Sequence, residues 1–102
     1  MKDKRVKQGS WKTLYLVYIA DVDGIQNFCG LYRTRSGAVS RCYVERGKLL
    51  LHFAELTKLP DKVWSTVYER AVEGMKSDNP DEWYNGSFEC PMIKEMEVLD
   101  EF

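Results

Sequence analysis

The chain has 102 residues, of which 44% are hydrophobic and 13% aromatic, and this supplies enough apolar material for one small core. Such a share excludes a chain that is disordered throughout, because disordered chains lack the material for a core. Basic and acidic residues nearly cancel at a net charge of −1, which excludes nucleic-acid binding driven by bulk charge alone. The length predicts a single domain over residues 1–102.

The first half of the chain predicts an antiparallel sheet that follows a basic N-terminal arm over residues 1–11. The run 13–20 is rich in β-branched and aromatic residues and apolar on both faces, which is typical of a central strand. Short turn sequences separate it from further runs of strand-forming residues. The predicted strands are 13–20, 28–34, 38–45 and 48–54, and together they make a β-meander over residues 12–55.

Two turns set the register of the predicted meander. Arg35–Gly37 is expected to form a three-residue hairpin loop, and Arg46 with Gly47 a two-residue turn. In this register Val44 faces Leu49 on an apolar sheet face, while the opposite face carries arginines and a tyrosine. The meander is therefore expected to bury one face in the core and to leave the other face exposed.

The second half of the chain predicts one helix and an acidic C-terminal segment. Pro60 is suited to a first helical turn, and apolar residues recur with helical spacing through residues 60–76, so this helix is expected to cover the apolar sheet face. Residues 77–102 form the acidic segment, in which 92–99 does not separate helix from strand. The expected fold class is α+β: an antiparallel four-stranded β-meander packed against one amphipathic α-helix, with an irregular C-terminal segment.

The cysteines Cys29, Cys42 and Cys90 indicate a reducing compartment. Their odd number and the absence of C-x-x-C spacing argue against a disulfide framework or a zinc site, so we expect three free thiols. The apolar run 14–20 is too short for a membrane span and lacks a signal-peptide cleavage site. These features predict a cytoplasmic protein without a membrane partner, located in the host cell cytoplasm if it is viral.

The string Asp21-Val-Asp23-Gly24 directly follows the first predicted strand. It resembles the strand end of haloacid-dehalogenase-type phosphotransferases, and with the following residues through Phe28 it resembles the first palm strand of the large subunit of type III CRISPR complexes. Either resemblance implies metal-dependent phosphotransfer at Asp21 and Asp23. The alternative is a β-turn with two solvated aspartates, which is the interpretation we adopt. His52, the single histidine, is interpreted as structural, and no cofactor or metal is expected.

Charge is strongly segregated along the chain. Residues 1–12 hold five cations against one anion, whereas residues 78–102 hold eight acids against Lys94. Such asymmetry, together with an excess of large aromatic rings, indicates binding of a partner. We expect the arginines and the tyrosine of the outward sheet face, and two rings of the C-terminal segment, to form the binding surface. The candidate residues are Arg33, Arg35, Arg41, Tyr43, Trp83 and Tyr84.

The absence of a catalytic signature favours a small non-catalytic protein-binding module over an enzyme. By its size it fits an inhibitor or accessory protein, of phage or mobile-element type, that docks on a larger host macromolecular complex. The first alternative is a nucleic-acid-binding protein that uses the basic sheet face. The second is metal-dependent phosphotransfer at the Asp21 and Asp23 turn. The sequence leaves open whether the protein is a monomer or a homodimer, and whether residues 95–101 fold over the arginine face.

Overall fold

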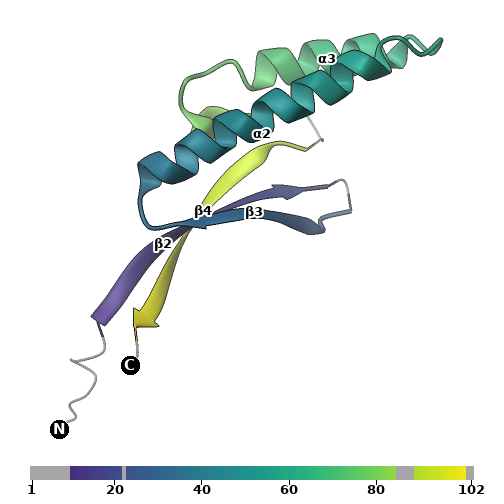
Figure 1. The fold of residues 1–102 in the computed structure, drawn as a ribbon. Coiled ribbons are helices and arrows are strands. Elements are labelled where there is room, and N and C mark those ends of the chain that lie inside the picture. The colour runs from purple at the N-terminus through teal and green to yellow at the C-terminus, as the bar shows by residue number, and fades with distance from the viewer. Residues whose placement is uncertain (1–9, 22, 85–88, 101–102) are drawn as a thin grey trace, which may run out of the picture.

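The computed structural model describes residues 10–21, 23–84 and 89–100. The described chain is α+β, with a three-stranded antiparallel sheet of order β3-β2-β4 (Figure 1). The strands are β2 (Ser10–Ala20), β3 (Gln26–Tyr32) and β4 (Pro91–Asp100). The helices are α2 (Arg35–Leu56) and α3 (Val63–Gly74), and a 3-10 turn, η1 (Pro80–Glu82), precedes β4. The α+β class is therefore confirmed, while the four-stranded meander with one helix is wrong.

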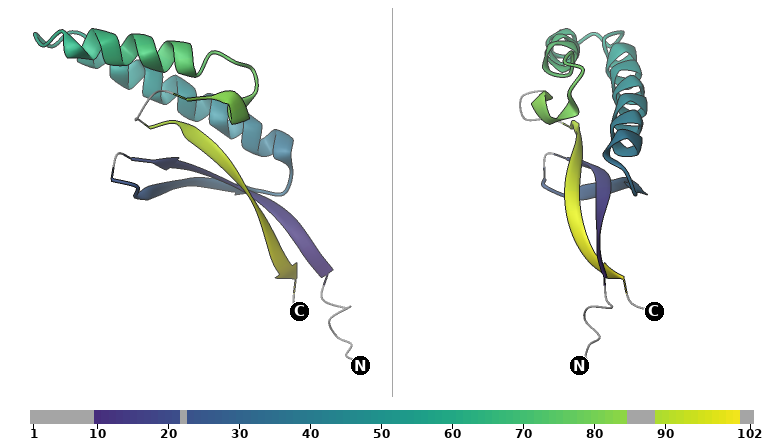
Figure 2. Two further views of the ribbon diagram at one scale, coloured as in Figure 1. Left: turned by 180° about the vertical axis from the view of Figure 1, so that it is seen from behind. Right: turned by 90° about the vertical axis from the view of Figure 1, so that its left-hand side faces the viewer.

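The connection between β3 and β4 determines which sheet face is covered. Both strands run antiparallel to β2, so they point the same way on either side of it. The chain must therefore cross the sheet between them, and it does so through α2 and α3. Both helices lie on the same side of the sheet (Figures 1 and 2). One face of the sheet is covered and the other is left open.

Residues 35–56 form one continuous helix, α2, where two strands were expected. Its buried residues recur every three or four positions, as one stripe of a helix requires. Thr34 caps the first turn, because its hydroxyl accepts a hydrogen bond from the backbone nitrogen of Gly37 at 3.1 Å. The buried stripe consists of Ala38, Cys42, Glu45, Leu49 and Phe53.

The corrections that follow from α2 concern the whole second half of the predicted meander. The strands 38–45 and 48–54 do not exist, and Arg46 and Gly47 lie inside the helix instead of in a turn. The predicted pairing of Val44 with Leu49 fails as well: Val44 is 52% exposed on the outside of α2, whereas Leu49 is buried. Arg41 and Tyr43, which were expected on the arginine-bearing sheet face, therefore belong to a helix.

The core lies between the sheet and α2, and between α2 and α3. The helix α2 contacts all three strands, whereas α3 packs against α2. The expected helix over 60–76 is thus present as α3, but its expected position against the sheet is wrong. The buried hydrophobic residues are Val17, Ala38, Cys42, Leu49, Phe53, Val67, Ala71, Met75, Trp83 and Cys90.

The chain ends also differ from expectation. β2 begins at Ser10, inside the predicted basic arm, of which residues 1–9 lie outside the described residues. The acidic segment 77–102 is not irregular, because it contains η1 and β4. Residues 95–100 pair with β2 in the sheet. An acidic tail folded over an arginine face is therefore excluded for this part of the chain, and Glu101 is outside the described residues.

β2 and β4 continue beyond the last residue of β3. Tyr15 pairs with Tyr32, whereas the pairing with β4 extends as far as Ser10 opposite Asp100. Residues 10–14 and 96–100 thus form a two-stranded ribbon that projects past the helices (Figures 1 and 2). The radius of gyration is accordingly 17.8 Å, compared with about 13 Å for a compact domain of this length.

Candidate interaction surface

The sheet face that points away from the helices is built from alternate residues of the three strands. Leu16 pairs with Leu31, Tyr18 with Phe28, and the even-numbered residues of β4 complete the row. Because directly paired residues share a face, these side chains all lie on one side of the sheet. We define the open face by Lys12, Leu14, Leu16, Tyr18, Phe28, Leu31, Met92, Lys94, Met96 and Val98.

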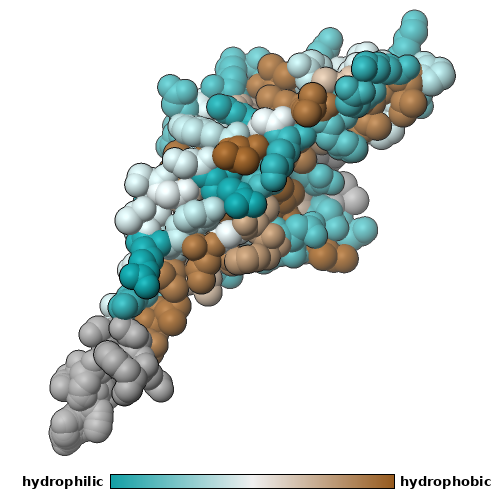
Figure 3. Space-filling view, viewed as in Figure 1, coloured by the Kyte–Doolittle hydropathy of each residue, from teal (hydrophilic) through white to brown (hydrophobic). Residues whose placement is uncertain are grey.

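The open face is apolar and has no cover among the described elements. Phe28 is 69% exposed, Leu31 49%, Met92 46% and Val98 36%. Figure 3 shows hydrophobic side chains along the lower edge of the molecule, over the strands and away from the helices. Contiguous apolar surface of this kind is uncommon on a soluble chain unless something binds it. The open face is therefore the candidate functional site.

A β-bulge brings the two most exposed residues of β3 onto the open face. The register of β3 against β2 shifts between Val17, which pairs with Gly30, and Tyr18, which pairs with Phe28. Cys29 is the extra residue, so Phe28 and Leu31 share a face although they are three positions apart. A strand without the bulge would place Phe28 on the same face as Gly30 and would turn Leu31 to the opposite face.

A hollow of about 320 Å³ opens where the ribbon leaves β3. Its apolar wall comes from β2, β3 and β4 together, and its cations are Lys12 and Arg33. Both cations are exposed, while the residues between them are apolar. The lining consists of Lys12, Leu14, Leu31, Tyr32, Arg33, Val98 and Leu99.

Each sheet edge carries a feature that disfavours pairing with another strand. The bulge interrupts the free edge of β3. On β4, Glu95 and Glu97 lie on the helix side of the strand, and the Thr13 hydroxyl donates to Glu97 at 2.9 Å. Bulges and charged side chains are the usual means by which proteins block edge pairing. The face of the sheet is consequently the more accessible binding surface.

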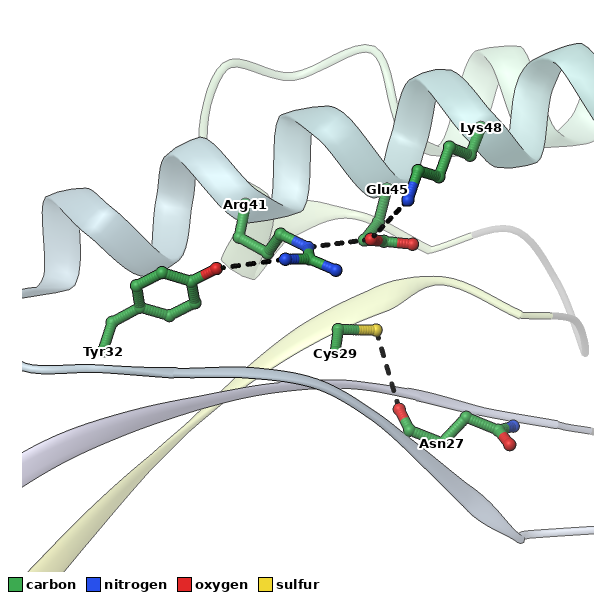
Figure 4. A network of polar contacts seen from close by, with 6 residues as sticks. All are labelled: Asn27, Cys29, Tyr32, Arg41, Glu45 and Lys48. Carbon is green, nitrogen blue, oxygen red and sulfur yellow. Dashed lines mark hydrogen bonds and ion pairs between the residues drawn. The ribbon is translucent and has the colours of Figure 1, made fainter.

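A polar network lies between α2 and the covered face (Figure 4). Arg41 Nε donates to Glu45 Oε2 at 2.8 Å, and Arg41 Nη1 donates to the Tyr32 hydroxyl at 3.4 Å. Lys48 Nζ lies 3.5 Å from the same Glu45 oxygen. The hydrogen bond that Arg41 donates to Glu45 raises the pKa of Arg41. Glu45, although buried, is thus neutralised by two cations on its own helix.

The three arginines predicted to bind a partner do not form one surface. Arg35 makes an ion pair with Asp81 of η1, and Arg41 belongs to the network around Glu45. Arg33 follows β3 and is exposed at the hollow beside Leu31. The structure therefore assigns internal contacts to two of these arginines and brings the third to the rim of the open face.

The predicted aromatic binding residues also do not form one surface. Trp83 is 7% exposed, and its indole nitrogen donates to the Ser77 carbonyl at 2.7 Å. The guanidinium of Arg46 lies 4.9 Å from the Trp83 ring centroid and 5.0 Å from that of Tyr43. Tyr43 and Trp83, whose ring centroids are 6.0 Å apart, thus form one cluster with Arg46 that anchors the segment around η1 to α2. Tyr84, the neighbour of Trp83, is 70% exposed.

The carboxylate of Asp21 stabilises the acidic turn that follows β2. Asp21 Oδ1 accepts from the backbone nitrogens of Asp23 and Ile25, both at 2.9 Å. Gly24 adopts φ 81°, a conformation that favours glycine. Among the residues described, no group of three or more histidine, cysteine or acidic side chains is arranged to hold a metal ion. This geometry matches the turn interpretation.

The three cysteines are free thiols, as expected, and two of them are buried. Burial raises the pKa of Cys42 to about 12, and the nearby thiols of Cys90 and Cys29 contribute. Burial raises the pKa of Cys90 to about 11. Cys29 lies half-buried in the bulge, and burial raises the pKa of its thiol too. Cys42 and Cys90 therefore behave as small apolar core residues.

Sequence reasoning missed most of the open face. A usable signal was present, because β2 alternates Lys12, Leu14, Leu16 and Tyr18 with the residues that face α2, and β4 alternates in the same way from Met92 to Val98. Two-residue alternation over the segment 92–99 favours a strand with two distinct faces. Because the residue types of 92–99 do not separate helix from strand, the sequence alone assigns the apolar side chains of this segment to no surface.

Comparisons with protein-family models, with curated proteins and with solved structures give no match for this chain. In the described part of the chain, neither helix combines the length and the apolar character that crossing a membrane requires. The function is therefore inferred from the residues themselves.

Proposed function

We propose that this chain is a small non-catalytic protein-binding module, an accessory or inhibitory protein that docks on a larger partner through the open face. The observation that carries the proposal is the exposure of Phe28, Leu31, Met92 and Val98 on one rigid sheet surface. Placing such a surface against a partner removes apolar area from water, at about 25 cal/mol for each Å².

The rigidity of the open face supports binding in preference to loose association. The backbone of the sheet is held by pairing of β2 on both sides and by α2 on the far face. Side chains on such a scaffold lose little further freedom when a partner binds. Phe28 and Tyr18 are paired rings of the kind that anchor interfaces.

The two alternatives have less support. The nucleic-acid interpretation relied on arginines of which Arg35 and Arg41 are engaged in internal ion pairs. The phosphotransfer interpretation required Asp21, whose carboxylate accepts two backbone hydrogen bonds within its own turn. Binding to single-stranded or duplex oligonucleotides that survives about 0.2 M salt would favour the nucleic-acid interpretation instead.

Site-specific photo-cross-linking tests the proposal. The photo-cross-linker p-benzoylphenylalanine replaces Phe28 on the open face, or, as a matched control, Leu51, which is 65% exposed on α2. After irradiation in cells of the source organism, we expect a discrete protein adduct from position 28 and none from position 51. Adducts of equal yield at both positions, an adduct with nucleic acid, or no adduct at position 28 would contradict the proposal.

A further inference from the structure

We infer that the occupant of the open face is an acidic amphipathic helix of a partner protein, which places an apolar side chain in the hollow and carboxylates against Arg33 and Lys94. This inference rests on the proposed function, and it adds the chemistry of the partner. Four observations carry it: the charge of the rim, the blocked edges of the sheet, the shape of the surface, and the composition of the segments that lie outside the described residues.

The rim of the open face is positive. Lys94 is exposed on the edge strand β4, and Arg33 is exposed at the end of β3, on the other side of the sheet. Among the side chains of the open face that the structure describes, none is a carboxylate, because Glu95 and Glu97 point to the helix side of β4. An apolar stripe between two cations is complementary to an apolar stripe between carboxylates.

The same rim disfavours a second copy of the chain. A face-to-face dimer would bring the apolar centres together, but it would also bring the Arg33 and Lys94 side chains of both copies into one interface. Like charges at an interface cost several kcal/mol. Edge-to-edge pairing of β4 with its copy would place the glutamates of the two strands close together. A partner of opposite charge avoids both costs.

The shape of the surface favours a helix. Strand addition is disfavoured by the bulge on β3 and the charges on β4. An apolar sheet face is otherwise covered by a second sheet or by helices. Three strands spaced about 4.8 Å apart make a surface of about the width of one helix, which has a diameter of about 10 Å. The partner helix would complete a three-layer arrangement, opposite α2.

The segments of residues 1–102 that lie outside the described residues do not have the composition of this cover. Residues 1–9 (MKDKRVKQG) carry four cations and only two apolar side chains, so they match neither the apolar centre nor the positive rim. The other segments outside the described residues are Val22, 85–88 and 101–102, which are too short to form a helix across the sheet. This composition favours a cover that comes from another molecule.

A helical peptide library provides the test. Each peptide has 18 residues with leucine or phenylalanine along one face, and the flanking positions are randomised among glutamate, lysine, glutamine and serine. Peptides are selected on the full chain and counter-selected on Leu31→Asp. We expect glutamate to be enriched at flanking positions, and the selected peptides to bind the double variant Arg33→Glu/Lys94→Glu at least tenfold more weakly. Lys62→Glu, an exposed lysine next to α3, is the matched charge control and should bind as the original chain does.

Several results would overturn the inference. Enrichment of lysine, no preference in charge, or no selected peptide would each contradict an acidic helical partner. If sedimentation shows that the original chain is a dimer and the Leu31→Asp variant is a monomer, the open face would be assigned to a second copy. Melting temperatures of all variants confirm that they remain folded. If the library shows no charge preference while position 28 still cross-links to a protein, the binding function stands and only the partner's chemistry is wrong.

Discussion

Arg41 Nε donates to Glu45 Oε2 at 2.8 Å, from one turn earlier on α2, and this pair lies where the helix packs against the covered sheet face (Figure 4). The side chain of Glu45 is only 10% exposed, so its charge is tolerated because Arg41 and Lys48 neutralise it. The carboxylate thus interrupts an otherwise apolar helix stripe with a satisfied polar group.

We therefore predict that Glu45→Gln lowers the free energy of unfolding by about 1.5–3 kcal/mol, because it removes a charge-assisted hydrogen bond. Glu55→Gln is the matched control, since Glu55 also lies on α2 and pairs with Lys58, which follows the helix, but is 60% exposed. That change should cost less than about 1 kcal/mol. Urea unfolding of the two variants measures the difference. Equal effects would show that the Glu45 pair is no stronger than a surface pair.

The neighbours Trp83 and Tyr84 make a second comparison. Trp83→Ala should lower the free energy of unfolding by about 3–5 kcal/mol, because it removes a buried ring and its hydrogen bond to Ser77. Tyr84→Ala should change it by no more than about 0.5 kcal/mol, as is usual for an exposed side chain. Thermal unfolding followed by near-ultraviolet circular dichroism reports both. A small effect at Trp83 would mean that its ring is exposed in solution.

Gly47 offers a stabilising change. It lies inside α2, and a Cβ added there would meet no atom within 4 Å. Gly47→Ala should therefore raise the free energy of unfolding by about 0.5–1 kcal/mol, because alanine loses less backbone freedom in a helix. Gly24→Ala should instead lower it, since Gly24 has φ 81°. If Gly47→Ala destabilised the protein, residues 46–48 would be a turn, as the sequence first indicated.

The buried thiols predict a loss of stability at alkaline pH. The pKa of Cys42 is raised from 9.0 to about 12, so the folded state keeps a proton that the unfolded chain releases above about pH 9. The folded state then binds more protons than the unfolded chain does. The free energy of unfolding therefore falls as the pH rises from about 9 towards 12. Cys42→Ala/Cys90→Ala should show a shallower fall. Identical slopes for the two proteins would exclude the thiols as the cause.

The acidic turn gives a prediction about the hairpin. Asp21→Ala should cost about 1 kcal/mol, because the backbone nitrogens of Asp23 and Ile25 lose their acceptor. Asp23→Ala should be close to neutral, since Asp23 is exposed. Denaturant unfolding compares the two. A loss of partner cross-linking in Asp23→Ala, with the fold intact, would instead place this turn in the function.

The sequence was sufficient for the elements whose periodicity is undisturbed. The run 13–20, the helix that became α3 and the turn at Asp21 were all predicted, because apolar spacing and turn residues agree there. It was insufficient for α2, whose buried stripe contains the polar Glu45 while Val44 and Leu51 are apolar and exposed. Those residues blur the helical period, and Gly37 and Gly47 resemble turn signals.

The candidate site was harder to predict than the fold. The sequence predicts arginines and aromatic rings as interface residues because of their type, whereas the structure gives Arg41 and Trp83 internal contacts. Composition does not distinguish these roles, because the same planar groups suit buried ion pairs and interfaces. The open face depends on the β3 bulge and on pairing of β2 with β4, which are long-range features that a local pattern does not contain.

That long-range pairing has a consequence for the order of folding. Thr13 and Glu97 are hydrogen-bonded although 84 positions separate them. The β2–β3 hairpin and the helix pair are local, and closing the chain over this separation is slow, so we expect β4 to dock last. Met92, Lys94 and Val98 then join the open face only in the final step. A partner that needs these side chains recognises the finished molecule and leaves nascent or partly unfolded chains unbound.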